Sequence, residues 1–512
     1  YITDAREAKE IDRISIQEIG IPSMVLMEKA ALAATGCIRS KISKADHILV
    51  VCGIGNNGGD GVAVARLLAE DGYQVMIALI GREEALTEET KQQLLIAKNL
   101  GVRTCKGLPE EAYNIVVDAL FGIGLSRTVE GEYADVINWM NEQDAIRFAL
   151  DIPSGISAST GEMLGQAVCA DYTITFGTNK RGLVLYPGCH YAGKVVVADI
   201  GFPHKAVEKV SPRTYTLTPQ EAVGQMPPRV LRSNKGSYGK VLVIAGSREI
   251  SGACYLSAAA AYRMGCGLVK VVTTEENAAV IKTKLPEALV KTYDAALDYS
   301  DPANREQLSE WLDEQIRWAT NIVIGPGIGQ ESPADILLER VLQEKNKAVV
   351  IDADGLNLLA EREECFVMRE DGSRKICLPE NVVLTPHLME MSRLVRVDLP
   401  QLRAHIVEQA LLSLEQVDCQ TLVLKDARTI VTDGNEVYVN TTGNDGLSSG
   451  GSGDVLSGMI AGLLAQGMKP KKAAVLAVCL HGMAADEYMK QGGRYSMMAT
   501  DILDMLVQIL PK

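Results

Sequence analysis

A strand, a glycine-rich turn and a helix follow one another in residues 47–72, HILVVCGIGNNGGDGVAVARLLAEDG. The apolar run predicts a buried strand, and the amphipathic pattern after the turn, closed by Gly72, predicts a helix. This order places the turn at a helix N-terminus, where free backbone N–H groups and the helix dipole attract anions. The stretch therefore predicts an α/β fold that binds a phosphate-bearing ligand.

The turn fits more than one kind of site. Gly53, Gly55 and Gly58 have the G-x-G-x-x-G spacing of a nicotinamide dehydrogenase. No clear ribose-binding carboxylate follows the next predicted strand, residues 73–81. A tight turn with Asp60 as the helix N-cap is the simplest alternative. Two asparagines and an aspartate inside the loop exceed what a pyrophosphate cradle needs, and they favour a catalytic dinucleotide site.

The composition is typical of a multidomain α/β protein. A chain of 512 residues is too long for one core and predicts two to four domains, at roughly 100–200 residues each. Hydrophobic residues make up 47% and aromatic residues 5%, with 46 glycines, which fits buried parallel strands. These values exclude fibrous and disordered classes of protein.

Charge and cysteine content limit which partners and which structural features are expected. A net charge of −14 disfavours nucleic acid and anionic membranes, which bind clustered Lys and Arg. The 11 cysteines include no C-x-x-C pair, which disfavours disulfides and a zinc site. Residues 1–22 lack an apolar signal region, and no later apolar run reaches the ~20 residues of a membrane span. We expect a cytoplasmic homo-oligomer that binds neither nucleic acid nor membrane.

Further strands alternate with helical patterns in the first part of the chain. This alternation predicts a mostly parallel sheet with ligands at the carboxyl ends of its strands. Asp118, Asp151 and Ser154 all follow predicted strands and are expected to converge with the opening loop on one crevice. The strand candidates are residues 113–122, 146–155, 171–177 and 193–201.

A second α/β series begins after a proline-rich stretch. Between about 202 and 237 the apolar periodicity fades and five prolines interrupt it, so we expect no regular element there. We predict domains at 1–211 and 226–512, joined by a linker at 212–225. The second α/β series consists of segments at 240–247, 268–274, 321–329, 348–359, 381–387 and 421–425, followed by a hairpin around Gly434 and three helical stretches.

A second glycine-rich loop, residues 450–454, precedes a strong helical pattern. Gly453 and Asp454 would lie at the helix N-terminus, where N–H groups can hold a phosphate and Asp454 can take a proton from an attacking hydroxyl. An N-cap role for Asp454 in a flexible loop is the alternative. His387 and Lys425 each follow a strand, which favours a nucleotide site.

Other polar residues are harder to assign from the sequence. Asp352 and Asp354 could orient a loop or bind Mg²⁺ through water, although paired acids after a strand are often turn residues. The remaining histidines lack such context and are interpreted as structural or surface residues: His47, His190, His204, His405 and His481.

Together these segments form a familiar pattern. The first part of the chain resembles the NAD(P)HX epimerases, through GIPSMVLMEKA at 20–30, GIGNNGGDG at 53–61, DALFGIG at 118–124, DIPSG at 151–155 and KRGLVLYPG at 180–188. The second resembles the ADP-dependent NAD(P)HX dehydratases, through NKGSYGKVLVIAGS at 234–247, SGA at 251–253, GPGIG at 325–329, DADGLN, TPH, LKDART and GGSGD. The resemblance implies a Rossmann-like three-layer domain followed by a ribokinase-like α/β domain.

The resemblance also implies a function for the first part. Its substrate would be hydrated NADH or NADPH, which carries a hydroxyl on C6 of the reduced nicotinamide ring. Asp151 would be the acid/base that exchanges the R and S forms, and Asn57, Asp118 and Ser154 would hold K⁺ through oxygen ligands. The dinucleotide-binding residues carried over from the family are Asn56, Asn57, Gly58, Gly59, Asp60, Gly122, Ile123, Gly124, Leu125, Ser126, Arg127 and Thr128.

For the second part the resemblance implies dehydration of the S form together with Mg²⁺, with ADP as co-substrate and ATP as the alternative. Asp454 would be the catalytic base. The substrate would contact Ala253, Gly327, Gly329 and His387, and the nucleotide would contact Lys425, Asp426, Ala427, Arg428, Thr429 and Gly453. The sequence departs from the family where Asp426 replaces a common glycine and where Leu388 and Met389 replace Pro-Gly.

Two other functions compete with this interpretation. The GSGD loop on a ribokinase-like sheet equally suits a kinase that phosphorylates a hydroxymethyl group of a sugar or vitamin precursor, although the attached epimerase-like half argues against it. The first half could instead be a non-catalytic ligand-sensing or scaffold module. The presence of Asp60, Asp118 and Asp151 together disfavours that alternative.

Overall fold

The computed structural model describes residues 1–369 and 374–511. Contacts divide the chain into two compact units, Tyr1–Thr214 and Tyr215–Lys512. Each unit is an α/β structure whose main sheet is mostly parallel, as the alternation of strands and helices predicts. Within the described residues, no helix is both long and apolar enough to cross a membrane.

The main sheet of the first unit has seven parallel strands in the order β4-β3-β2-β5-β6-β7-β9. Their bounds are β2 (His47–Cys52), β3 (Gln74–Leu79), β4 (Arg103–Lys106), β5 (Ile115–Ala119), β6 (Ile146–Leu150), β7 (Tyr172–Phe176) and β9 (Lys194–Ala198). Short strands β1 (Ile2–Thr3) and β8 (Asn179–Lys180) pair in parallel and are not part of this sheet. The strand β4 was not predicted, because its residues RTCK carry no apolar run.

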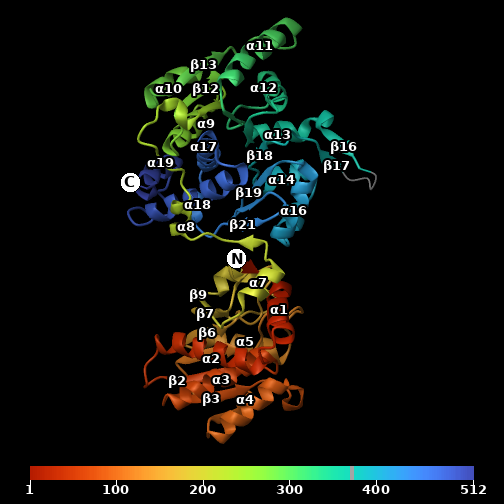
Figure 1. Ribbon diagram of the computed structural model, residues 1–512, viewed down its shortest axis with the longest axis vertical. Helices are drawn as coiled ribbons and strands as arrows, with labels where there is room; N and C mark the ends of the chain where they lie inside the picture. Colours follow the sequence, from red (N-terminus) through yellow and green to blue (C-terminus); the bar gives the residue numbers. More distant parts are fainter. Residues whose placement is uncertain (370–373, 512) are drawn as a thin grey trace. The chain divides into compact units, whose positions relative to one another are not determined.

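Helices cover both faces of this sheet (Figure 1). Alternate strand residues such as Val50 and Ile77 pack against α2, α3 and α4, whereas Leu49 and Met76 pack against α5. This gives the three layers of a Rossmann-like domain. The helices are α1 (Ala5–Arg13), α2 (Ser23–Arg39), α3 (Asn56–Glu70), α4 (Glu88–Asn99), α5 (Glu132–Glu142), α6 (Gly188–Tyr191) and α7 (His204–Val210).

The sheet of the second unit runs in the order β13-β12-β11-β14-β15-β18-β19-β20-β21. It is parallel through β19 and ends in antiparallel pairs, and the hairpin predicted around Gly434 joins β20 to β21. The strands are β11 (Lys240–Ile244), β12 (Leu268–Thr274), β13 (Leu289–Tyr293), β14 (Asn321–Ile324), β15 (Ala348–Ile351), β18 (Val382–Leu384), β19 (Thr421–Leu424), β20 (Ile430–Thr432) and β21 (Val437–Val439), with a separate hairpin of β16 (Phe366–Met368) and β17 (Arg374–Ile376).

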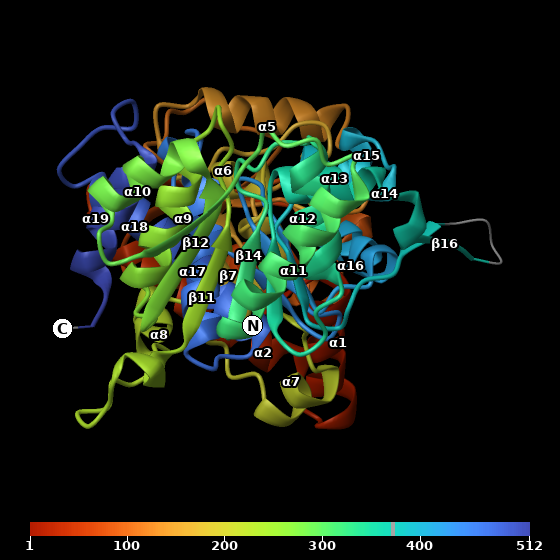
Figure 2. The same cartoon turned by 90° about the horizontal axis from the view of Figure 1, so that it is seen from above.

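Two groups of helices flank this sheet. One core contains alternate strand residues such as Val241 and Val243 together with residues of α9, α17, α18 and α19. A second group of helices, α11, α12 and α13, lies together in another part of the unit (Figure 2). The helices are α8 (Pro219–Gly224), α9 (Gly252–Arg263), α10 (Ala278–Lys284), α11 (Pro302–Trp318), α12 (Ser332–Leu342), α13 (Asp354–Glu361), α14 (Leu388–Val395), α15 (Leu399–Arg403), α16 (Ile406–Val417), α17 (Ser452–Ala465), α18 (Pro470–Tyr488) and α19 (Ala499–Ile509).

The proline-rich stretch is more ordered than expected. The prediction that 202–237 lacks regular elements is wrong, since it contains α7, α8 and the short β10 (Thr214–Tyr215). Pro219 occupies the first turn of α8, where a missing N–H costs nothing, and Thr218 and Glu221 form a capping box. Ala222 of α8 is fully buried in the core of the second unit.

Candidate functional sites

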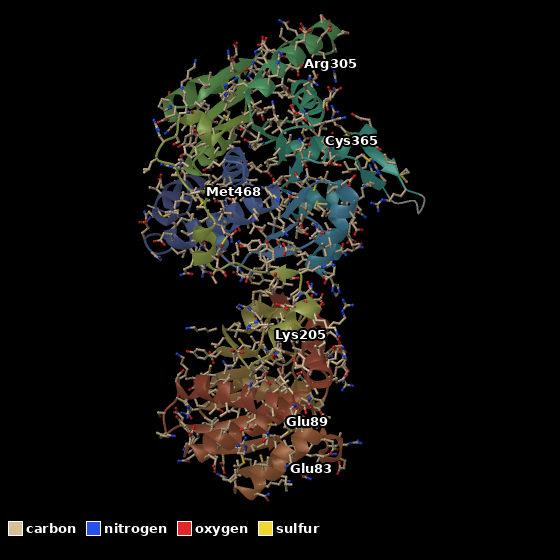
Figure 3. The ribbon with its side chains drawn as sticks, in the orientation of Figure 1. Glu83, Glu89, Lys205, Arg305, Cys365 and Met468 are labelled. Atoms are coloured by element: carbon tan, nitrogen blue, oxygen red, sulfur yellow. The ribbon has the colours of Figure 1, made fainter. Side chains whose placement is uncertain are left out.

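The first unit contains a cavity of about 580 Å³ at the carboxyl edge of its sheet. Its wall combines the start of α3, the segment after β5 and side chains of α1 and α2. Glu89, labelled in Figure 3, lies in the first turn of α4 and also lines it. Of the residues carried over from the family, the wall includes Asn56, Asn57, Asp60, Gly122, Ile123, Gly124, Leu125, Ser126, Arg127 and Asp151.

Helix α3 places backbone and carboxylate groups at this cavity. Its N-cap is Gly55, so the interpretation of Asp60 as the N-cap is wrong. A Cβ at Gly55 would meet nothing within 4 Å, whereas one at Gly58 would lie 1.9 Å from the carbonyl oxygen of Gly53. Gly55 therefore leaves the helix start open to a ligand, while Gly58 serves close packing of the turn. Burial, then the charge of Asp151, raises the pKa of Asp60 well above its usual value.

Asp151 forms a buried ion pair at the edge of the cavity. It follows β6 with φ of 64°, a left-handed conformation that is strained for a residue with a side chain. Its Oδ1 lies 2.7 Å from Lys180 Nζ, and Thr175 Oγ1 donates to the same oxygen over 3.3 Å. Lys180 Nζ also donates to the carbonyl of Phe176 over 2.7 Å. Asp151 and Lys180 both line the cavity, so a bound ligand can contact both side chains.

Behind the cavity wall, Asp118 and Ser154 form a tight polar pair. Ser154 donates to the Asp118 carboxylate from its backbone N–H over 2.7 Å and from its hydroxyl over 2.6 Å. Burial raises the pKa of Asp118 to about 6, although the hydrogen bonds from Ser154 oppose this rise. The structure thus joins two of the three predicted K⁺ ligands directly.

The third predicted K⁺ ligand, Asn57, packs against the segment after β5. A Cβ at Gly122 would lie 3.2 Å from Asn57 Cβ and 3.4 Å from its Oδ1. Both polar atoms of the Asn57 amide are buried and have no hydrogen-bond partner among the described residues. A buried amide without a partner is costly. Its oxygen, with the Asp118 carboxylate and the Ser154 hydroxyl, is a donor set that fits a hard cation.

In the second unit, α17 carries the second glycine-rich loop. Its N-cap is Gly451 with φ of 93°, and Asp454 is the third helical residue, so the N-cap interpretation of Asp454 is wrong. A Cβ at Gly458 would lie 2.1 Å from the carbonyl oxygen of Ser257. This glycine lets α17 contact α9, and Ser257 Oγ donates to the Asp454 carbonyl over 2.9 Å. The backbone of Asp454 is therefore held by tertiary contacts.

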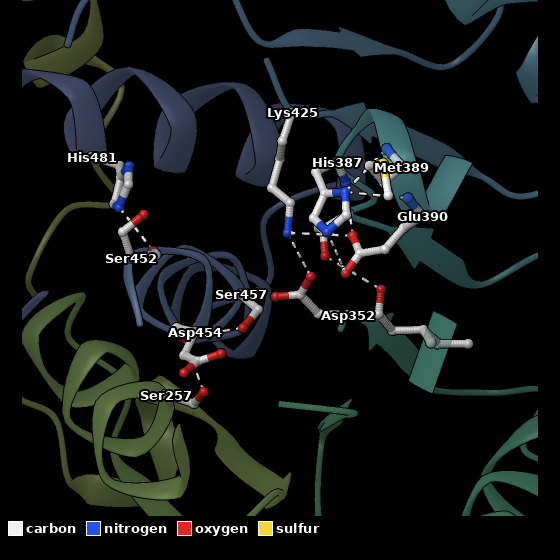
Figure 4. A network of polar contacts seen from close by, with 12 residues as sticks. Ser257, Asp352, His387, Met389, Glu390, Lys425, Ser452, Asp454, Ser457 and His481 are labelled. Carbon is white, nitrogen blue, oxygen red and sulfur yellow. Dashed lines mark hydrogen bonds and ion pairs between the residues drawn. The ribbon is translucent and has the colours of Figure 1, made fainter. Parts of the chain in front are cut away.

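His481 supports the same helix start. Its Nε2 lies 3.0 Å from the carbonyl oxygen of Ser452, and burial lowers the pKa of His481 to about 4. The neutral ring therefore donates to Ser452 (Figure 4). This agrees with the interpretation of His481 as a structural residue.

Lys425 lies at the centre of a cluster of carboxylates (Figure 4). Its Nζ is 2.8 Å from Asp352 Oδ1, and a Cβ at Gly453 would lie 3.3 Å from the same Nζ. Burial tends to lower the pKa of Lys425, but Asp352 and Glu390 outweigh it and raise this pKa. Burial, then Asp352, raises the pKa of Asp454 to about 7, although Lys425 opposes the rise. Asp454 is thus suited to take and release a proton near neutral pH.

His387 joins the cluster from α14. It is the N-cap of this helix, and its Nδ1 accepts from the backbone N–H of Met389 over 3.1 Å and of Glu390 over 3.2 Å. Its backbone pairs with Lys425, which donates its N–H to the carbonyl of Pro386 over 2.8 Å. The predicted meeting of His387 and Lys425 at one edge of the sheet is therefore observed. The substitution of Leu388 and Met389 for Pro-Gly keeps this cap intact.

The other predicted residues of the second site lie around this cluster. Gly327 packs on Ala253, since a Cβ at Gly327 would lie 3.0 Å from Ala253 Cβ. Gly329 donates its N–H to Asp354 Oδ2 over 3.0 Å, so Asp354 orients the GPGIG loop. The segment after Lys425 is looser: Asp426 and Ala427 are exposed. Its last two predicted residues make backbone contacts, Arg428 to the carbonyl of Thr441 and Thr429 to that of Asp426.

Three residues at these sites were not predicted. Lys180 belongs to the KRG motif, which signalled it only through the family resemblance. Glu390 stands three residues after His387, the spacing of a capping box, and this pattern could have identified it. Asp12 of α1 lines the first cavity, and burial, then Asp151, raises its pKa. No motif marks Asp12 in the sequence.

Comparison with known proteins agrees with this arrangement. Residues 241–508 match the family described as NAD(P)H-hydrate dehydratase, and residues 23–182 match the YjeF-related protein N-terminus. A bifunctional NAD(P)H-hydrate repair enzyme of Moorella thermoacetica is 36% identical over 100% of this chain and 96% of the relative. Its namesake in Escherichia coli is 32% identical over 100% and 93%.

A solved structure is also similar to part of this chain. The ADP/ATP-dependent NAD(P)H-hydrate dehydratase of Bacillus subtilis, co-crystallised with ATP and Mg²⁺, is 27% identical with a TM-score of 0.47, covering 57% of this chain and 96% of that one. The assignment of this chain to a family rests on the two family matches and on the full-length relatives. The chain belongs to the bifunctional NAD(P)H-hydrate repair enzymes.

Proposed function

We propose that this protein restores hydrated NADH and NADPH in two steps: the first unit exchanges the R and S epimers, and the second dehydrates the S form with ADP. The observation that carries this proposal is that one chain combines two sites. The first is a dinucleotide-sized cavity that ends at the Asp151–Lys180 pair. The second is a helix start that carries Asp454 beside Lys425.

Epimerisation needs a group that moves a proton to and from the C6 hydroxyl. Protonation of this hydroxyl lets water leave, because the ring nitrogen next to C6 stabilises the resulting iminium ion. Water then returns from either face, which exchanges the two epimers. Asp151 is the group we assign to this proton transfer, and Lys180 holds its carboxylate in place at 2.7 Å. The open helix start at Gly55 suits the pyrophosphate of the dinucleotide.

We further propose that Asn57, Asp118 and Ser154 hold K⁺, which would supply a fixed positive charge behind the substrate. The support is the buried Asn57 amide described above and the buried Asp118 carboxylate. Exchange of K⁺ for the bulky cation N-methylglucamine should lower the epimerisation rate by roughly tenfold, the size expected when about 1.4 kcal/mol of favourable interaction is lost. Rates measured at constant ionic strength, with KCl added back, check this; an unchanged rate would remove K⁺ from the account.

Dehydration needs help because hydroxide is a poor leaving group. In our proposal Asp454 takes the proton of the C6 hydroxyl while the oxygen attacks the terminal phosphoryl group of ADP, and AMP leaves. The ring nitrogen then expels phosphate from C6, and loss of a proton from C5 restores the double bond. The products are NADH or NADPH, AMP and phosphate. The free N–H groups at the start of α17 and the Lys425 ammonium would stabilise charge on the transferred phosphoryl group.

Magnesium would enter this site with the nucleotide. The described residues contain no group of three or more His, Cys, Asp or Glu side chains suited to a metal ion, and Asp352 is paired with Lys425. Mg²⁺ commonly binds through substrate phosphates and one or two carboxylates. We therefore propose that the nucleotide phosphates supply most of its ligands. ADP is the proposed donor, and ATP is the second candidate.

The decisive test of the dehydratase proposal uses the purified S form of hydrated NADH with ADP. NADH, AMP and phosphate should form in equal amounts, as followed by absorbance and by ³¹P NMR. A panel of sugar and vitamin-precursor alcohols with ATP tests the kinase alternative. A stable phosphorylated alcohol, without NADH recovery, would replace the proposed function by the kinase function.

We also propose that the two units fold and act independently, with the domain limits 1–211 and 226–512 adjusted to the division at 214/215. Pieces 1–214 and 215–512 should both be soluble. The first should interconvert the epimers without nucleotide, and the second should restore only the S form. Each piece is checked by thermal unfolding and by its own assay. Two insoluble or inactive pieces would show that the units depend on each other.

A further inference from the structure

Glu390 is a buried carboxylate that none of the proposed steps uses. It lies in the first turn of α14 and is 5% exposed. Its Oε2 accepts from the backbone N–H of His387 over 2.8 Å, and its Oε1 lies 3.3 Å from His387 Nε2. The same carboxylate reaches Lys425, whose Nζ is 4.0 Å from Oε2. Glu390 therefore contacts one residue assigned to the hydrated substrate and one assigned to the nucleotide (Figure 4).

Two backbone N–H groups of α14 fix the protonation of the His387 ring. Its Nδ1 accepts from two backbone N–H groups, so this nitrogen carries no proton in the neutral ring. The proton is therefore on Nε2, which lies 3.3 Å from Glu390 Oε1. In this state His387 has no free lone pair for a base. It can only donate, and an acceptor atom of a ligand can share its Nε2–H.

The contact between Glu390 and Lys425 works against binding of the nucleotide. Lys425 already pairs with Asp352 at 2.8 Å, and Glu390 adds a second buried carboxylate beside the same ammonium. Negative charge in excess around Lys425 opposes the binding of an anionic phosphate. Glu390 should therefore favour binding of the substrate without strengthening binding of the nucleotide.

We propose that Glu390 is a positioning residue of the dehydratase site: it holds His387 as an Nε2–H donor toward an acceptor atom of the hydrated substrate. This inference rests on the proposed function for its ligand, but the ring state of His387 is independent of that function. Glu390 acts through His387 and does not touch the reacting atoms. The substrate group it selects is a hydrogen-bond acceptor, a class that includes the carboxamide oxygen of the nicotinamide ring.

The test variant is Glu390→Gln, which keeps the size of the side chain and removes its charge. The KM for the S form of hydrated NADH should rise about tenfold, the effect of one lost hydrogen bond of about 1.4 kcal/mol. The dissociation constant for ADP, measured by calorimetry on the full chain, should not rise. Glu380→Gln makes the same charge change at an exposed position of this unit and should leave both values unchanged.

A double-mutant cycle separates positioning from general damage. In a His387→Gln background, Glu390→Gln should no longer raise the KM, because both changes remove the same contact. A parallel loss of substrate and ADP binding, or full additivity of the two mutations, would contradict the proposal.

The ring state can be measured without any ligand. Long-range ¹H–¹⁵N spectra of the ¹⁵N-histidine-labelled full chain, assigned with His387→Gln, should show His387 protonated on Nε2 alone at neutral pH. A proton on Nδ1 in the wild-type protein would overturn the proposal, whatever the variants do. Failure of the wild type to restore NADH would refute the proposed function instead, and would leave this spectral result standing.

Discussion

Asp454→Asn should lower the rate of dehydration by about 100-fold or more while ADP still binds. The amide keeps the shape of the side chain but cannot take the proton of the attacking hydroxyl, and general base catalysis typically contributes 10²–10⁴-fold. The nucleotide should remain bound because its proposed contacts are the backbone N–H groups of α17 and the Lys425 ammonium. NADH recovery from the S form gives the rate, and calorimetry with ADP gives the affinity.

The pH dependence provides an independent check of Asp454. Burial and the charges of Asp352 and Asp354 raise its pKa to about 7, with Lys425 opposing them. A base must be deprotonated, so kcat/KM of the wild type should rise with pH and level off above about 7. Glu390→Gln should keep this rise. Asp504→Asn, an exposed change in the same unit, should alter neither activity nor ADP binding. Loss of ADP affinity in step with activity in Asp454→Asn would favour a purely structural role for Asp454.

Asp151→Asn should slow epimerisation by about 100-fold or more and leave dehydration of the S form untouched. The neutral amide cannot exchange a proton with the C6 hydroxyl, and it also leaves the buried Lys180 ammonium without its partner. NMR or chromatography of the R and S forms gives the rate. Because an unpaired buried charge is destabilising by roughly 3–5 kcal/mol, thermal unfolding must accompany the assay.

A second change tests whether Asp151 acts chemically or only structurally. Asp151→Asn combined with Lys180→Met removes the unpaired ammonium, so stability should recover while epimerisation stays slow. Asp144→Asn, an exposed change of the same kind, should behave like the wild type. A near-normal epimerisation rate in the stable double variant would remove Asp151 from the mechanism.

The parallel sheets could be predicted because their strands are buried on both faces and form continuous apolar runs such as residues 48–52 and 241–244. Strands without such runs were missed. β4 has the sequence RTCK and is mostly exposed, and β13 is partly exposed at the edge of its sheet. An edge strand needs apolar residues on few positions, so its pattern resembles that of a loop.

Helix starts were placed correctly, but the alternative in which an aspartate caps each of them was wrong. Both glycine-rich loops contain an aspartate that suits an N-cap, yet Gly55 and Gly451 occupy these positions. At Gly451 the φ of 93° favours glycine, whereas Gly55 has an extended backbone that any residue can adopt. As a result Asp60 lies inside its helix and lines the cavity, and Asp454 lies in the first turn of its own helix.

The sequence predicted which segments meet at each site, but it did not predict which side chains pair there. Strand order alone brings Asp118 and Ser154, or His387 and Lys425, to one edge of a sheet. The partner of a buried charge depends on side-chain direction, which sequence spacing does not give. Lys180 beside Asp151 and Glu390 beside His387 are both pairs of this kind. The roles of the individual residues and the oligomeric state stay predictions.

The most direct test of the account follows NADH absorbance after the full-length protein meets an equal mixture of R and S hydrated NADH with excess ADP. We predict complete recovery of NADH, with one AMP formed for each NADH, because the first unit converts the R form as the second consumes the S form. Under the same conditions Asp151→Asn should recover the S half promptly and the R half only slowly. A wild-type protein that recovers no NADH, or that stops at half, would contradict the account.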